Sequence, residues 1–107
     1  MQTPFRSGAL VVLYLHSPRE KVWGVLKELT AAGVSVRGVD LRSFDDWLRG
    51  AGTAEGQGIA ASMAFYPLAR VEKILLDEPE DGLGFDAQCA ARTGRRAAEL
   101  LDPAPAR

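Results

Sequence analysis

Two glycines, Gly24 and Gly38, interrupt two consecutive apolar segments and constrain the fold more than any other feature of the sequence. A glycine inside a strand marks a bend, a bulge or a close approach of two backbones. In residues 34–41 apolar and polar residues alternate on both sides of Gly38, but the phase slips by one residue at the glycine. We therefore predict that residues 21–29 and 34–41 form two strongly bent strands joined by a short turn, with the glycines at the bends.

The same region also fits a different interpretation, in which residues 18–32 form a helix. Residues 17–20, Ser-Pro-Arg-Glu, make a capping box with proline at the first helical position, apolar residues follow at helical spacing, and Gly33 suits a C-terminal cap. This interpretation predicts an α/β sandwich with a β-α-β unit at residues 9–41, and periodicity alone slightly favours it. Gly24 argues against it, because a glycine in a helix interior costs about 1 kcal/mol.

The other elements follow from apolar runs and from the residues that begin and end helices. One apolar run without alternation predicts a strand covered on both faces, and a proline corner separates two later strands. A serine N-cap followed by two aspartates predicts a short helix, and the last helix is expected to be interrupted or strained at Gly94. The expected elements are a strand at 9–15, a helix at 43–49, a mobile glycine-rich loop at 50–58, strands at 63–67 and 70–77, and a helix at 85–101.

The composition fits a single globular domain. The chain has 107 residues, of which 47% are hydrophobic and 25% are charged, and this is enough to bury a core. We assign residues 9–101 to the domain, residues 1–8 to a flexible lead-in and residues 102–107 to a disordered tail. The single cysteine excludes an internal disulfide, no signal-peptide pattern is present, and the longest apolar run is too short to span a bilayer. We therefore expect a cytoplasmic protein without membrane contact.

The order of these segments resembles the Sm-like superfamily of small bent β-barrels, which includes Hfq. The similarity lies in Val11–Leu15, in Lys21–Leu26 with its internal glycine, in Val34–Asp40, and in the corner at Phe65–Ile74. It implies a mainly β or α+β fold, a small bent five-stranded Sm-like (SH3-like) barrel, with a short helix inserted and another helix added at the C-terminus. It also implies RNA binding, although this chain lacks the Asp-Asn pair and the basic residue with glycine of the family's RNA-binding loops.

No residue pattern indicates catalysis or a metal centre. His16 is the only histidine and lies at a strand end, Cys89 is expected to be a small buried side chain, and Asp45 and Asp46 would point about 100° apart on a helix. The glycine-rich loop lacks the spacing of a nucleotide-binding motif. We therefore predict that the protein is not an enzyme and holds neither a cofactor nor a metal.

Positive and negative charges nearly balance, with 13 Lys and Arg against 14 Asp and Glu, so no overall basic field attracts nucleic acid. An acidic run at residues 77–86 is expected to be a solvated loop. Arginines and aspartates of the middle region are expected to form a structural network of ion pairs: Arg37, Arg42, Arg49 and Arg70 with Asp40, Asp45 and Asp46.

Aromatic residues next to charged ones form the candidate interaction surface, since tryptophan, tyrosine and arginine dominate the energetics of protein interfaces. Trp47 has two interpretations, a plug in the open end of the barrel or an anchor for a partner. The preferred function is a non-enzymatic interaction module, an adaptor or a self-assembling protein, that uses edge strands and this surface. The alternatives are an RNA-binding Sm-like protein, and a small ligand-binding domain or enzyme that uses His16 and carboxylates. The candidate surface comprises Trp23, Arg37, Phe44, Trp47, Arg49, Tyr66 and Arg70.

Overall fold

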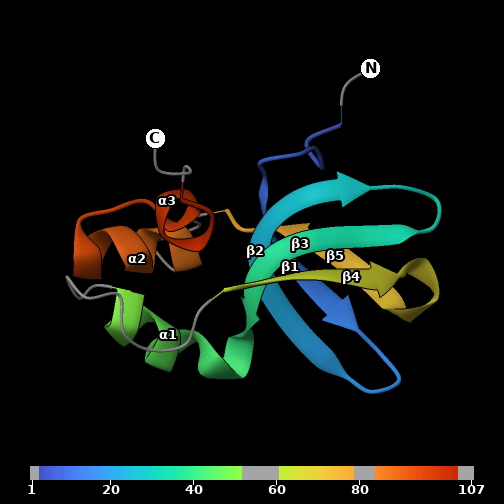
Figure 1. Ribbon diagram of the computed structural model, residues 1–107, viewed down its shortest axis with the longest axis horizontal. Coiled ribbons are helices and arrows are strands. Elements are labelled where there is room, and N and C mark those ends of the chain that lie inside the picture. Colours follow the sequence, from blue (N-terminus) through green and yellow to red (C-terminus); the bar gives the residue numbers. More distant parts are fainter. Residues whose placement is uncertain (1–2, 52–60, 79–83, 104–107) are drawn as a thin grey trace.

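The structure, a computed structural model, describes residues 3–51, 61–78 and 84–103. Five antiparallel strands form one open sheet in the order β4-β3-β2-β1-β5, so β4 and β5 are its two edges (Figure 1). The expectation of a mainly β domain with short added helices is confirmed. The strands are β1 Leu10–Leu15, β2 Glu20–Leu29, β3 Gly33–Asp40, β4 Ser62–Pro67 and β5 Val71–Leu76. The helices are η1 Leu41–Ser43, α1 Phe44–Ala51, η2 Leu68–Arg70, α2 Phe85–Thr93 and α3 Ala97–Leu101.

Residues 20–29 form a strand, so the alternative β-α-β unit at residues 9–41 is wrong. β2 pairs with β1 on one side and with β3 on the other. Pairing with two neighbouring strands stabilises β2 more than the local helical preference of its apolar spacing would stabilise a helix. Ser17, the expected helix N-cap, instead has a left-handed backbone with φ 59° in the turn before β2.

Gly24 and Gly38 lie directly opposite each other in β2 and β3, within strands that curve strongly along their length (Figure 1). A Cβ atom on Gly24 would lie 2.4 Å from the carbonyl oxygen of Arg37, and a Cβ atom on Gly38 would lie 2.2 Å from that of Trp23. Both distances are far inside van der Waals contact. The close approach of the two backbones therefore requires glycine at both positions.

The phase slip at Gly38 does not come from a bulge at that residue. β3 pairs with β2 in continuous register through Gly38, and the irregularity of this pair lies near Lys27 in β2. Val34 and Val36 point to one face of the sheet, whereas Val39 points to the other. The apolar residues change phase because both faces of the sheet are covered, so an apolar side chain is stabilised on either face.

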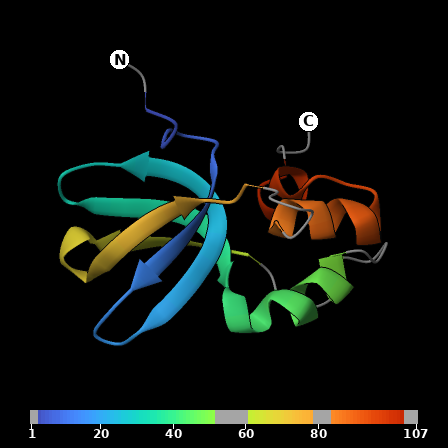
Figure 2. The same cartoon turned by 180° about the vertical axis from the view of Figure 1, so that it is seen from behind.

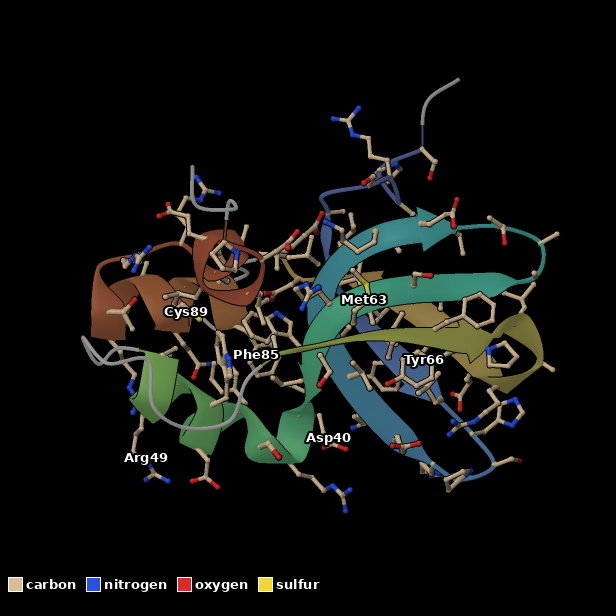
Figure 3. All side chains as sticks on the ribbon, in the orientation of Figure 1. Asp40, Arg49, Met63, Tyr66, Phe85 and Cys89 are labelled. Atoms are coloured by element: carbon tan, nitrogen blue, oxygen red, sulfur yellow. The ribbon has the colours of Figure 1, made fainter. Side chains whose placement is uncertain are left out.

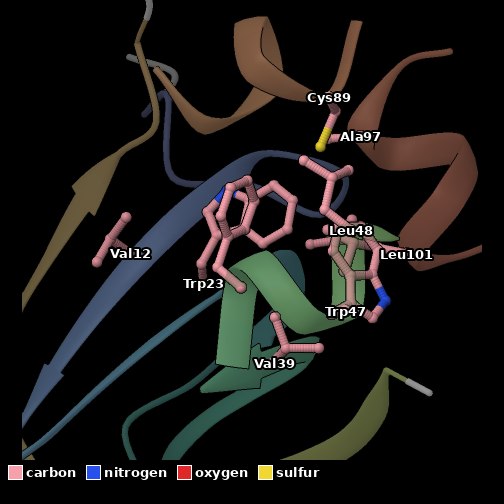
Figure 4. Close-up of a cluster of buried hydrophobic side chains, with 10 residues drawn as sticks. Val12, Trp23, Val39, Trp47, Leu48, Cys89, Ala97 and Leu101 are labelled. Atoms are coloured by element: carbon pink, nitrogen blue, oxygen red, sulfur yellow. The ribbon is translucent and has the colours of Figure 1, made fainter. Parts of the chain in front are cut away.

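Two apolar clusters cover the two faces of the sheet. The inner cluster consists of strand residues alone: Val11, Leu13, Leu15, Val22, Leu26, Val34 and Val36. The outer cluster lies between the opposite face and the three α-helices, which gather at one end of the sheet (Figures 1 and 2). β1 contributes to both clusters, which confirms the predicted strand covered on both faces. The outer cluster contains Val12, Trp23, Val25, Val39, Phe44, Trp47, Leu48, Cys89, Ala97 and Leu101, most of which Figure 4 labels.

The predicted C-terminal helix at residues 85–101 is two helices, α2 and α3. The interruption expected at Gly94 ends α2, and this residue adopts the left-handed conformation with φ 74°. The break changes the direction of the chain, so that Cys89 of α2 and Leu101 of α3 both reach the outer cluster (Figure 4). The predicted helix at 43–49 is confirmed as α1, which extends to Ala51.

Two aspartates of the acidic run begin the C-terminal helices, so the prediction of a solvated loop is wrong for them. Asp77 accepts hydrogen bonds from the backbone N–H groups of Phe85 and Asp86, both at 3.0 Å, at the start of α2. Its Oδ2 also accepts the Nε1–H of Trp23 at 3.0 Å. Asp86 in turn accepts from the backbone N–H of Ala97 at 2.9 Å and begins α3. Carboxylates stabilise helix N-termini in this way.

Replacement of Asp77 by asparagine should lower the free energy of unfolding by about 1–3 kcal/mol, because an amide NH2 would face a donor where a carboxylate oxygen now accepts. Urea denaturation followed by circular dichroism measures the change. The matched control is Glu78→Gln, which removes the same charge from the adjacent exposed residue and should leave stability unchanged. Equal effects of the two substitutions would contradict the assigned role of Asp77.

Both ends of the described chain contact the sheet. Gly8 donates a backbone hydrogen bond to the carbonyl of Leu26 at 2.8 Å, and Phe5 packs against the inner cluster. Asp102 lies 2.5 Å from Lys27 Nζ and 3.4 Å from Arg37 Nε. Most of the expected mobile loop and most of the expected tail fall at 52–60 and 104–107, outside the described residues.

Candidate functional site

Three of the seven residues predicted for the interaction surface are buried, and for them the prediction is wrong. Trp23, Phe44 and Trp47 have exposed fractions of 0%, 4% and 2% and belong to the outer cluster, in which Figure 4 labels the two tryptophans. The Trp23 ring makes edge contacts with Phe44 and Trp47, with centroids 5.2 and 5.3 Å apart. The sequence suggested exposure because acidic residues precede Trp47, but Asp45 and Asp46 are exposed whereas the side chain of Trp47 is buried. Trp47 is a core residue between α1 and the sheet.

The side chain of Arg70 links η2 by hydrogen bonds to the turn between β1 and β2. Its guanidinium donates to the carbonyls of His16 and Pro18 at 3.2 and 2.9 Å, and to the Glu20 carboxylate at 2.7 Å. It also lies 5.9 Å from the centre of the Tyr66 ring. Burial raises the pKa of the Tyr66 hydroxyl, and the Glu20 carboxylate raises it further. Arg70 is thus a structural contact rather than a free cation.

The other predicted arginines also have acidic partners, in a network that differs in part from the expected one. Arg42 pairs with Asp40 and holds the pKa of that carboxyl below its usual range through side-chain hydrogen bonds. Arg49 pairs with Asp46, and Figure 3 shows Arg49 pointing away from the helices. Arg37 forms an ion pair with Asp102 instead, and this pair links the C-terminal end of α3 to β3.

The two side chains with potentially reactive groups, His16 and Cys89, lie in different surroundings. His16 lies exposed in the turn after β1, where its Nδ1 is 3.2 Å from the Ser17 hydroxyl. Cys89 is fully buried, and burial raises the pKa of its thiol to about 12, so the reactive thiolate is suppressed. Within the described ranges, no group of three His, Cys, Asp or Glu side chains is placed to hold a metal ion. No helix in these ranges is long and apolar enough to cross a membrane.

Exposed apolar side chains concentrate on edge strand β4 and the adjoining η2. Met63, Phe65 and Leu68 have exposed fractions of 48%, 54% and 44%. The Phe65 ring lies over Gly33 of the neighbouring strand, where a Cβ atom would come within 2.6 Å of the ring. Sequence reasoning missed this surface, although the alternation within Ser62–Pro67 signals it by placing methionine and phenylalanine on one face.

The opposite face of β4 borders a hollow of about 260 Å³, which we call the inner hollow. Its walls are partly apolar, and Glu20 and Asp40 are the charged residues among those that line it. Tyr66 lies on the wall that β4 provides, and Figure 3 labels it together with Asp40 at the end of β3. The full lining is Glu20, Val22, Val36, Gly38, Val39, Asp40, Ser43, Ser62, Ala64 and Tyr66.

Comparison of the chain with protein-family models, with curated proteins and with solved structures finds no match. The geometry of β4 and of the inner hollow therefore carries the functional argument.

Proposed function

We propose that this protein is a non-enzymatic interaction module that binds an extended segment of a partner protein along β4. The observation that carries the proposal is the exposed apolar pair Met63 and Phe65 on a strand at the edge of the sheet. In strand addition the partner's backbone hydrogen-bonds to the free edge, and its side chains pack against the exposed side chains of that strand.

The two edges of the sheet differ in the way that this proposal requires. β5 carries Glu72 and Lys73, both exposed, and charged side chains protect an edge from pairing with another chain. β4 has the sequence Ser-Met-Ala-Phe-Tyr-Pro without any charge, and its one proline, Pro67, lies at its last position. Among the described strands, β4 has β3 as its only neighbour. An uncharged, apolar edge is a surface suited to pairing with another strand.

We also propose that the fold is a divergent Sm-like barrel. The order of strand pairing supports this proposal. β4 and β5 lie at opposite ends of the sheet, yet only the three residues of η2 separate them in the sequence. Side chains of both edges, Tyr66 on β4 and Val71 and Ile74 on β5, also pack against the inner cluster. A sheet that curls in this way brings its two ends toward each other.

A lysine in place of Phe65 tests the docking function. Phe65→Lys should reduce partner retention in affinity capture from a native cell extract at least about tenfold, because it places a charge in the contact and removes the aromatic anchor. The captured partner should also slow hydrogen exchange of the β4 amides. The matched control is Leu75→Lys, which places lysine on the other edge strand at a side chain of similar exposure and should retain the partner.

Equal retention by the wild type and Phe65→Lys, or slowed exchange confined to the helices, would contradict docking on β4. Retention of RNA instead of protein, with an affinity that falls steeply as salt is raised, would support the alternative of a nucleic-acid-binding protein.

A further inference from the structure

We infer that the segment bound along β4 alternates apolar side chains with lysine or arginine, and that one of the basic side chains enters the inner hollow. This inference rests on the proposed function, since it assumes that the partner pairs with β4. It specifies the chemistry of the partner, which the exposed edge alone does not.

The two faces of β4 determine what each side of an added strand meets. Successive side chains of a strand point to opposite faces, and neighbouring strands align their side chains in rows. Met63 and Phe65 form the outer row of β4, opposite Arg37 and Ser35 of β3. The remaining side chains, Ser62, Ala64 and Tyr66, form its inner row and line the inner hollow. Every second side chain of an added strand would therefore lie on the face of the sheet that carries the hollow.

The outer row selects apolar side chains in the partner. Met63 and Phe65 are each about half exposed, and β4 itself has no charged residue that would pair with a polar partner. Apolar side chains packed on this row would remove both from water, which favours the complex. Valine, isoleucine or leucine at alternate positions of the partner fits this row.

On the inner face of β4, the lining of the hollow favours a basic side chain in the partner. Glu20 and Asp40 are the charged lining residues, and the arginines that pair with them, Arg70 and Arg42, are not part of the lining. Glu20 accepts from Arg70 through Oε2, whereas its Oε1 accepts no hydrogen bond within the described part of the chain. A carboxylate has capacity for about four hydrogen bonds, so Glu20 can accept a further donor.

Tyr66 and the size of the hollow further restrict the kind of group that the hollow can bind. The Tyr66 hydroxyl makes no hydrogen bond to any described residue, although it lines the hollow together with Glu20. Arg70 already lies 5.9 Å from the centre of the Tyr66 ring, so the hydroxyl oxygen is the group of this side chain that can accept a donor from a partner. The hollow, at about 260 Å³, is smaller than the roughly 300–1,000 Å³ typical of small-molecule sites. It therefore suits one long side chain better than a cofactor.

Synthetic peptides test the inference directly. The probe is a fluorescent seven-residue peptide of alternating lysine and valine, and two comparison peptides carry glutamine or glutamate in place of lysine. A fourth peptide has the composition of the probe with its lysines and valines in two blocks. Fluorescence anisotropy should show that the full chain binds the alternating lysine peptide at least about tenfold more tightly than each of the other three, with an affinity that falls as salt is raised.

Two matched substitutions locate the basic side chain. Glu20→Gln should reduce the affinity for the lysine peptide to that for the glutamine peptide and leave the glutamine peptide unaffected. Glu72→Gln removes the same charge from the opposite edge strand and should leave both affinities unchanged. Urea denaturation of each variant identifies any loss of folded protein, because Glu20 also pairs with Arg70.

The outcomes separate the inference from the function on which it rests. Equal binding of the lysine and glutamine peptides, or equal effects of Glu20→Gln and Glu72→Gln, would overturn the inference while docking on β4 stands. The inference would also fail if light scattering showed a stable oligomer that Phe65→Lys dissociates, since a second copy of the chain would then occupy β4. If Phe65→Lys bound every peptide and partner as tightly as the wild type, the proposed function would fail as well.

Discussion

Replacement of Gly38 by alanine should lower the free energy of unfolding by about 3 kcal/mol or more, or prevent folding altogether. The added Cβ atom would lie 2.2 Å from the Trp23 carbonyl oxygen and 2.8 Å from the Gly24 Cα. Both contacts are with backbone atoms in the middle of a paired strand, so relief requires β2 and β3 to separate. Urea denaturation followed by circular dichroism measures the loss.

The control for this substitution is Gly94→Ala. Gly94 has open space around its Cα and a left-handed backbone, so alanine there meets no atom and costs only about 1 kcal/mol of conformational strain. A much larger effect at Gly38 than at Gly94 isolates the close approach of the two strands as the cause. Similar effects at both positions would show that the backbones of β2 and β3 can separate at little energetic cost.

Trp23→Ala is expected to lower the free energy of unfolding by about 3–5 kcal/mol, the range typical of a fully buried tryptophan. Its side chain has no exposed area and contacts the aromatic rings of Phe44, Trp47 and Phe85. These rings come from α1 and α2, so the tryptophan connects the sheet to the helices. Its loss would leave a large cavity in the outer cluster, and thermal and urea denaturation both report the change.

Trp23→Phe separates the hydrogen bond of this residue from its packing. Phenylalanine retains most of the apolar contact but loses the Nε1–H that Asp77 accepts, so we expect a loss of about 1–2 kcal/mol. In the Asp77→Asn background the same substitution should cost less, because the acceptor is already altered. A Trp23→Ala variant with unchanged stability and weakened partner binding would instead restore the original interpretation of this residue as an interface anchor.

The proposed docking site lies mostly on a different part of the molecule from the predicted surface. The sequence directed attention to aromatic residues beside charges, and the structure buries three of them, Trp23, Phe44 and Trp47. Tyr66 alone among the seven predicted residues lines the inner hollow. The residues that now carry the docking proposal, Met63 and Phe65, lie in a segment that the sequence identified correctly as a strand. Their exposure depends on that strand being at an edge, which local patterning does not report.

Much of the local structure could be predicted from the sequence. The apolar run before residue 16 indicated a strand covered on both faces, and the serine followed by aspartates indicated α1. The interruption at Gly94 was also predictable, because a left-handed C-terminal position favours glycine. These features depend on residues only a few positions apart in the chain, so the sequence alone predicts them.

The local sequence of residues 20–29 could not decide between strand and helix, because it carries apolar spacing that fits either structure. Pairing with β1 and β3 makes this segment a strand. Long-range contacts also decided the role of Asp77, which begins α2 and binds an indole 54 positions away in the sequence. The sequence by itself determined the doubly covered first strand, the short helix α1 and two critical glycines. Only the tertiary structure decided which side chains are buried and which edge is exposed, because those properties depend on the segments that meet when the sheet curls and the helices cover one face.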